Sequence, residues 1–104
     1  MSYQIIWSSF AEKQLTQIFD YYKEVANHSI ASKIVSDIII TPNKLLENTE
    51  IGQIEELIHR EIKYRYFLHK NYKTVYSIDT ELNFIKIADV FDTRQNPIKI
   101  QRNT

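Results

Sequence analysis

Hydrophobic residues recur along this chain with two different periods, and the change from one to the other predicts its organisation. Tyr3, Ile5 and Trp7 occupy every second position near the start, which predicts a short, half-buried strand. Over residues 9–46 the apolar positions follow three- and four-residue steps, the spacing of amphipathic helices. From residue 63 onward the period returns to two. The pattern therefore predicts a strand, a helical region and a group of further strands, in that order.

The first helix is predicted from a capping signal and a single apolar face. Ser9 followed by Glu12 has the spacing of a capping box, so the helix should begin there. Asn27 is the residue at which we expect it to end. Its apolar face consists of Ala11, Leu15, Ile18, Phe19, Tyr22, Val25 and Ala26.

The second helix follows after a very short connection, so the two helices should form an antiparallel hairpin. Ser29 is predicted to cap it. Pro42 must kink or end the helix, although Leu45 and Leu46 continue its apolar stripe. The buried side is predicted to contain Ile30, Ile34, Val35, Ile38 and Ile39.

Residues 48–62 are the hardest part of the chain to place. Ile51, Ile54 and Leu57 are apolar enough to pack on the core, and Gly52 allows a turn. We expect a loop that lies on the core, with room for one helical turn.

Three strands joined by tight turns are predicted to follow. Over residues 63–69 the odd positions should point to one side of the sheet and the even positions to the other. Lys70-Asn71 is a predicted hairpin turn, since Asn tolerates positive φ. The remaining predicted elements are the strand Tyr72–Asp79, the turn Thr80–Asn83 and the strand Phe84–Phe91.

These elements predict an α+β fold in one domain over residues 1–104, in the order strand, helix, helix, strand, strand, strand. The helix hairpin must cover one face of a small, mainly antiparallel sheet, which the first strand is expected to join. We expect the uncovered face to carry Lys63, Arg65, Phe67, His69, Lys73 and, at its edge, Arg94. Basic groups interleaved with aromatic rings on an open sheet are typical of a nucleic-acid contact.

Composition narrows the classes of protein to which the chain can belong. Its 104 residues are 43% hydrophobic and 25% charged, which is ordinary for a soluble globular protein. The absence of cysteine excludes disulfides and a thiol nucleophile. No Gly-rich phosphate loop, metal-ligand cluster or serine triad pattern occurs, so we expect no metal and no cofactor. With no basic leader and no long apolar run, we expect a cytoplasmic protein without a membrane partner.

The formal net charge of zero conceals two oppositely charged halves. Residues 1–62 carry five Lys/Arg against nine Asp/Glu, whereas residues 63–104 carry eight against four. Such an asymmetry suggests partners of different character, although solvated faces can also differ by chance. The isoelectric point of about 6.8 gives no basic footprint over the whole domain, which argues against action on ribosomal RNA.

The end of the last predicted strand is its most distinctive polar segment. Asp92-Thr93-Arg94 places a guanidinium at the edge of the sheet, where it can meet a phosphate or a carboxylate. Pro97 then prevents further ladder pairing. Pairing of Arg94 with Asp92, with Asp89 or with the chain's own backbone is as good an explanation of the segment as a functional contact.

Four segments carry a resemblance when the chain is considered as a whole: Ile6-Trp7-Ser8, Asn48–Gln53, the hairpin from Tyr64 to Tyr76, and Val90–Pro97. In this order, on the predicted pattern of elements, they resemble the RelE/ParE superfamily of type II toxin–antitoxin systems. The last two are characteristic of ParE-type, or plasmid-stabilisation, toxins.

The resemblance implies a small toxin that a cognate antitoxin holds silent in a hetero-oligomer. RelE-type members cut mRNA in the ribosome, using basic residues on the open sheet face and often a tyrosine or histidine near the C-terminus. ParE-type members inhibit DNA gyrase by binding, without catalytic residues of this kind.

Candidate site residues follow from the resemblance by position. Arg65, Lys73 and Arg94 match the basic residues of RelE-type toxins and would be catalytic only in that reading, with His69 as a weaker candidate base. Phe67 stands where those toxins often have a lysine, and residues 98–104 contain no Tyr or His. The leading hypothesis is therefore a non-enzymatic inhibitor of DNA gyrase. The alternatives are a ribosome-dependent mRNA endoribonuclease and an inactive, antitoxin-binding remnant.

Overall fold

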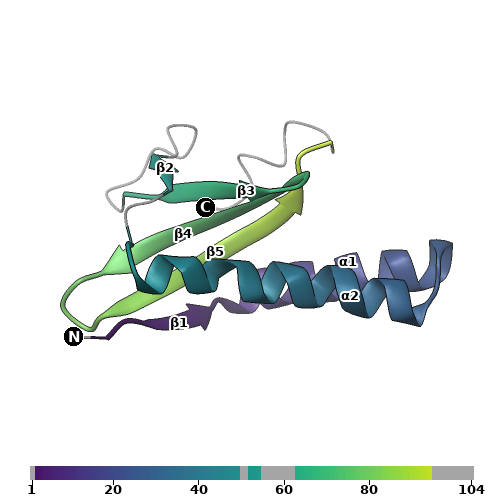
Figure 1. The fold of residues 1–104 in the computed structure, drawn as a ribbon, viewed down its shortest axis with the longest axis horizontal. Helices are drawn as coiled ribbons and strands as arrows, with labels where there is room; N and C mark the ends of the chain where they lie inside the picture. Colours follow the sequence, from purple (N-terminus) through teal and green to yellow (C-terminus); the bar gives the residue numbers. More distant parts are fainter. Residues whose placement is uncertain (1, 50–51, 55–62, 95–104) are drawn as a thin grey trace.

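Two helices and a five-stranded sheet make up the fold (Figure 1). The computed structural model describes residues 2–49, 52–54 and 63–94. In chain order the elements are β1 (Gln4–Trp7), α1 (Ser9–Val25), α2 (His28–Ile40), the 3₁₀ helix η1 (Thr41–Leu46), β2 (Gln53–Ile54), β3 (Arg65–His69), β4 (Tyr72–Asp79) and β5 (Phe84–Asp92). The predicted α+β class and the helix hairpin are confirmed, and the short strand β2 is an addition that the sequence did not predict.

The sheet is mixed, with the strand order β1-β5-β4-β3-β2. The predicted pairing of the first strand is confirmed: β1 runs parallel to β5, and every other neighbouring pair is antiparallel. A bulge shifts the β4–β5 register between Val75 and Tyr76, which leaves Ala88 without a partner in the ladder. The Ser8 hydroxyl donates to the Ala88 carbonyl (3.1 Å), so the bulge is tied to the start of α1.

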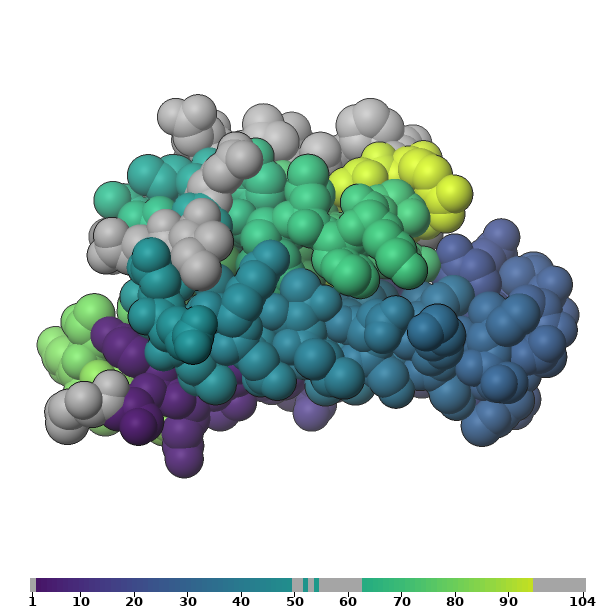
Figure 2. Space-filling model, viewed as in Figure 1, coloured from purple at the N-terminus to yellow at the C-terminus, as the bar shows by residue number. Residues whose placement is uncertain are grey.

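The two helices cover one face of this sheet, as predicted. α1 packs on β5, and α2 packs on α1, so that the hairpin runs along the sheet (Figure 1). Figure 2 shows the surface of α2 extending across the molecule below the β3–β4 hairpin. Beneath the helices lie two apolar clusters, whose buried members are Ala11, Leu45, Phe67, Tyr76, Ile85 and Ile87 in one and Ile38, Tyr72 and Val90 in the other.

Both helix caps differ by a residue or two from the prediction. The cap of α1 is Ser8, whose hydroxyl accepts a hydrogen bond from the Ala11 N–H (3.0 Å), and Ser9 is the first helical residue. Asn27 caps α2 by accepting from the Ile30 N–H (2.9 Å), so it begins the second helix and does not end the first. Ser29, predicted as that cap, lies inside α2. Adjacent Ser, Asn and Ser residues offer equivalent capping side chains, and only the backbone path selects among them.

Ser8→Ala should therefore destabilise the protein by about 1–2 kcal/mol, because it removes both the cap and the hydrogen bond to the bulge. The neighbouring substitution Ser9→Ala serves as the control, since Ser9 makes no cap and alanine favours helix. Urea denaturation of the two variants measures the difference. Equal stability of the two would show that Ser8 does not cap α1.

The predicted end of the second helix near Pro42 is confirmed, and a 3₁₀ helix follows it. α2 ends at Ile40, and Pro42 stands in the first turn of η1, which continues the chain as a 3₁₀ helix. Leu45 is fully buried, whereas Leu46 is 43% exposed, so only one of the two leucines continues the stripe. Of the loop predicted over residues 48–62, with room for one helical turn, residues 50–51 and 55–62 lie outside the described residues.

Candidate functional site at the end of β5

The cations that the sequence grouped on one open face are not on one face. In the β3–β4 hairpin Arg65 lies opposite Tyr76, and Lys73 lies opposite Leu68. Directly opposite residues share a face, and neighbours along a strand alternate. Arg65 therefore shares the helix-covered face with Tyr76, while Lys73 is on the other face. Arg65, Phe67 and His69 share one face, as predicted, but it is the covered face, and the prediction that Lys73 accompanies them is wrong.

Arg65 has a structural contact in this position. Its Nη1 donates to the carbonyl of Gly52 at 3.0 Å. The Gly52 N–H in turn donates to the hydroxyl of Tyr76 at 3.0 Å, and that hydroxyl donates to the Thr49 carbonyl at 2.9 Å. Arg65 thus fastens the segment before β2 to the sheet.

Lys73 is buried and is not a solvated cation. Lys73 is only 8% exposed. Its Nζ lies 4.1 Å from the centroid of the Tyr66 ring and 6.0 Å from that of the Phe91 ring. Val75 and Asp89, on the same face, are also buried. The expected open basic face is therefore wrong at these positions.

Phe67 and His69 complete this correction. Phe67 belongs to the core cluster, with Nζ of Lys44 located 4.4 Å above its ring. His69 lies at the hairpin end opposite Tyr72, and its buried Nε2 has no hydrogen-bond partner among the described residues. The turn that follows has its positive φ at Lys70 (55°), not at Asn71 as expected, and Asn83 (59°) supplies it in the β4–β5 turn.

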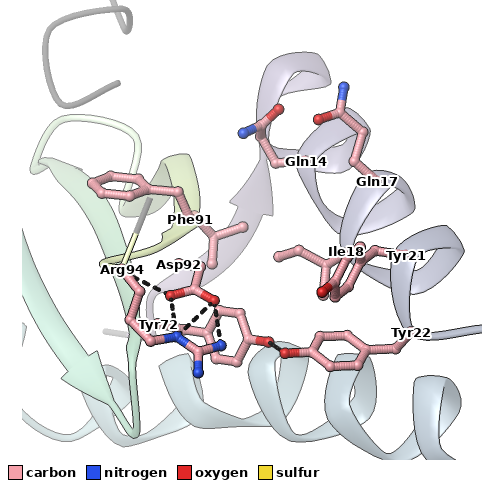
Figure 3. Close-up of a pocket in the computed structure, with 10 residues that line it drawn as sticks. Gln14, Gln17, Ile18, Tyr21, Tyr22, Tyr72, Phe91, Asp92 and Arg94 are labelled. Atoms are coloured by element: carbon pink, nitrogen blue, oxygen red, sulfur yellow. Dashed lines mark hydrogen bonds and ion pairs between the residues drawn. The ribbon is translucent and has the colours of Figure 1, made fainter. Parts of the chain in front are cut away.

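Arg94 lies elsewhere, at the rim of a pocket between α1 and the ends of β4 and β5 (Figure 3). The pocket has a volume of about 470 Å³. It is lined from α1 by Gln14, Gln17, Ile18, Tyr21 and Tyr22, and from the strands by Tyr72, Val90, Phe91, Asp92 and Arg94. The Phe91 ring points away from the tyrosines, so this residue contributes mainly its backbone (Figure 3).

Arg94 and Asp92 form a close ion pair at this rim. Nη2 of Arg94 donates to Oδ2 of Asp92 at 2.7 Å, and Nε donates to Oδ1 at 3.0 Å. The Arg94 backbone N–H also donates to Oδ1, at 2.8 Å, which closes a tight turn after β5. The guanidinium lowers the pKa of Asp92 to about 2, and the carboxylate raises the pKa of Arg94 further above its ordinary value. The predicted pairing of Arg94 with Asp92 is thus present.

Two tyrosines, one from α1 and one from β4, line the pocket together. The Tyr72 hydroxyl donates to the Tyr22 hydroxyl at 3.0 Å, which connects the start of β4 to α1 (Figure 3). Burial, reinforced by this hydrogen bond, raises the pKa of Tyr72 well above its ordinary value. A phenol with a raised pKa stays protonated at neutral pH, so Tyr72 acts as a hydrogen-bond donor and not as a base.

The α1 side of this pocket was missed by the sequence reading. Gln14, Gln17 and Tyr21 follow one another at helical spacing beside the apolar face. Their spacing was a usable signal, but nothing in the sequence showed that the end of β5 lies against them.

The described residues contain neither a metal-binding cluster nor a membrane-spanning helix. No group of three or more His, Cys, Asp or Glu residues in residues 2–49, 52–54 and 63–94 could hold a metal ion. Over the same residues, no helix is both long enough and apolar enough to cross a membrane.

A family model, that of the ParE toxin of the type II toxin–antitoxin system parDE, matches residues 5–97. The chain belongs to the ParE toxin family. The match covers most of the chain, including all four segments on which the resemblance depended, so the resemblance is confirmed. This ParE family member is therefore a toxin of a type II toxin–antitoxin system, within the ParE/RelE superfamily. No curated protein sequence matches the chain.

Solved structures support the fold of this family member. A chain of the chromosomal ParDE toxin–antitoxin system from P. aeruginosa is similar with a TM-score of 0.71 and 18% identity, covering 88% of this chain and 97% of that chain. The RelBE2 toxin–antitoxin complex from Mycobacterium tuberculosis gives a TM-score of 0.65 and 16% identity, covering 88% and 99%. The isolated RelE toxin of E. coli gives 0.56 and 11%, covering 93% and 90%. At these identities the similarity shows a shared fold alone.

Proposed function

We propose that this ParE family member inhibits DNA gyrase by binding to it in the cytoplasm, and that a cognate antitoxin neutralises it. The observation that carries this proposal is the separation of the cations. Arg65, Lys73 and Arg94 were the residues expected to act together on a phosphate, and each occupies a different site in the fold.

Arg65 and Arg94 lie too far apart along the sheet to contact the same phosphate group. Arg65 lies opposite Tyr76, whereas Asp92, the partner of Arg94, lies opposite Tyr72. Four residues along β4 correspond to about 13 Å, and Lys73 is on the other side of the sheet. Stabilising a cleaving phosphodiester requires donors about 3 Å from the same oxygens. This arrangement supports a toxin that works by contact rather than by cleavage.

The direct test is a supercoiling assay with purified gyrase and relaxed plasmid. We expect the toxin to stop ATP-dependent supercoiling at micromolar concentration, and we expect purified cognate antitoxin to restore it. Denatured toxin at the same concentration is the control. Full supercoiling at every toxin concentration would refute gyrase as the target.

Ribosome-dependent mRNA cleavage is the second candidate, because the fold is shared with the RelE toxin and Arg94 follows the last strand as expected. Primer extension on mRNA after induction would then show codon-linked cuts that Arg94→Ala removes. A chain that shows neither effect, and is harmless without its antitoxin, would be a remnant that only binds the antitoxin.

A further inference from the structure

The pocket at the end of β5 offers hydrogen-bond donors that the Arg94–Asp92 pair does not use. Both oxygens of Asp92 already accept hydrogen bonds from Arg94. Asp92 engages only Nε and Nη2 of the guanidinium, so the N–H groups of Nη1 are outside this pair. Because Tyr72 donates to Tyr22, the proton of the Tyr22 hydroxyl remains for another acceptor.

Within the ion pair, the Arg94 guanidinium is accessible to a partner and the Asp92 carboxylate is largely covered. The Arg94 side chain is 67% exposed, whereas that of Asp92 is 14% exposed. An incoming group therefore meets the guanidinium first. A guanidinium has five N–H donors and can hold two carboxylates on different edges.

We propose that this pocket docks an acidic side chain of a partner protein, with Arg94 as the anchor and Asp92 as an internal competitor that limits the affinity. The inference rests on the proposed function, since a toxin that acts by contact needs a surface that recognises protein. It goes further by naming the residue that binds and the chemistry that it selects.

The remaining walls favour a protein over a nucleic acid. Arg94 is the single cation among the described residues that line the pocket. Nucleic acids present phosphates in series, and proteins bind them with several cations along a track. Tyrosine beside glutamine, over an apolar floor of Ile18 and Val90, is instead typical of a surface that receives a peptide.

The experiment measures fluorescence anisotropy with the full chain and three labelled probes. The first is a short peptide in which Glu alternates with Leu, the second has Gln in place of every Glu, and the third is single-stranded oligouridylate RNA. We expect the acidic peptide to bind more tightly than the other two. Arg94→Gln should weaken its binding about tenfold, and Asp92→Asn should tighten it about three- to tenfold.

Lys33→Gln is the matched control, because it removes the same charge from an exposed position on α2, an element that does not line the pocket. It should leave peptide binding within about twofold. Loss of fold cannot imitate the expected result, since the substitutions at positions 92 and 94 act in opposite directions. Thermal unfolding of each variant checks this point independently.

Five results would overturn the inference: no binding of the acidic peptide, equal binding of the Gln peptide, tighter binding of the RNA, an Arg94→Gln variant that binds equally well, or an Asp92→Asn variant that binds no better. The supercoiling assay distinguishes failure of the pocket inference from failure of the proposed function. If gyrase is inhibited while Arg94→Gln has no effect on the peptide, the pocket inference alone is wrong. If the peptide behaves as expected but supercoiling is unaffected, gyrase alone is wrong as the target.

Discussion

Gly52→Ala should lower the free energy of unfolding by about 2–4 kcal/mol, because no space exists for the added methyl group. A Cβ at Gly52 would lie 2.5 Å from the Tyr76 hydroxyl oxygen and 2.7 Å from the Tyr66 carbonyl oxygen. Tyr76 is fully buried, and its hydroxyl is held by both Gly52 and Thr49, so it cannot move aside cheaply. Urea denaturation followed by circular dichroism measures the loss.

The companion variant Tyr76→Phe identifies which contact is responsible. Alone it should cost about 1–3 kcal/mol, since the Gly52 N–H and the Thr49 carbonyl each lose a partner. Combined with Gly52→Ala it removes the nearest clash, although the contacts with the Tyr66 backbone and with the Cε1 ring carbon of residue 76 remain. The two effects should therefore be less than additive. A Gly52→Ala variant as stable as the original protein would contradict this account of the segment.

Leu45→Ala should destabilise the protein by about 2–5 kcal/mol, which is the usual cost of emptying a well-packed leucine site. Leu45 is 0% exposed and belongs to the same cluster as Tyr76, Ile85 and Ile87. The effect matters because η1, which carries Pro42 in its first turn, could be mistaken for a connecting loop. The same denaturation experiment gives the value.

The adjacent residue provides the control for this substitution. Leu46 is chemically identical but 43% exposed, so Leu46→Ala should cost less than about 1 kcal/mol. Comparable losses at the two positions would mean that η1 does not hold Leu45 in the core.

Most of the fold could be predicted because the hydrophobic period reports directly which residues are buried. Helices and strands were placed within a few residues by apolar spacing, Pro42 and the turn residues. The capping residues could not be settled from Ser8, Ser9, Asn27 and Ser29 alone, since all four side chains can cap a helix.

The error in the sheet faces has a different origin. A two-residue turn at Lys70-Asn71 pairs His69 with Tyr72. Moving away from the turn by four residues on each strand then pairs Arg65 with Tyr76. Odd positions of β3 therefore share a face with even positions of β4, and Arg65 cannot accompany Lys73. This relation followed from the predicted turn itself.

The candidate site was predictable only in part. The ion pair of Arg94 with Asp92 is local, so the sequence Asp92-Thr93-Arg94 was sufficient to suggest it. The packing of this segment against Tyr22 and Gln17 joins residues about 70 positions apart, and the contact of Gly52 with Tyr76 spans 24 positions. Such contacts depend on the assembled topology, and no local pattern encodes them.

The strand order also has a consequence for the timing of synthesis. Among the described strands β5 is translated last, yet it lies between β1 and β4 and joins the two sides of the sheet. The 80 positions that separate Ser8 from Ala88 take roughly 4–16 s to translate at about 5–20 residues per second. During this interval the nascent chain has neither a closed sheet nor the rim of its pocket. Any surface that spans both sides of the sheet can therefore form only after β5 has been synthesised.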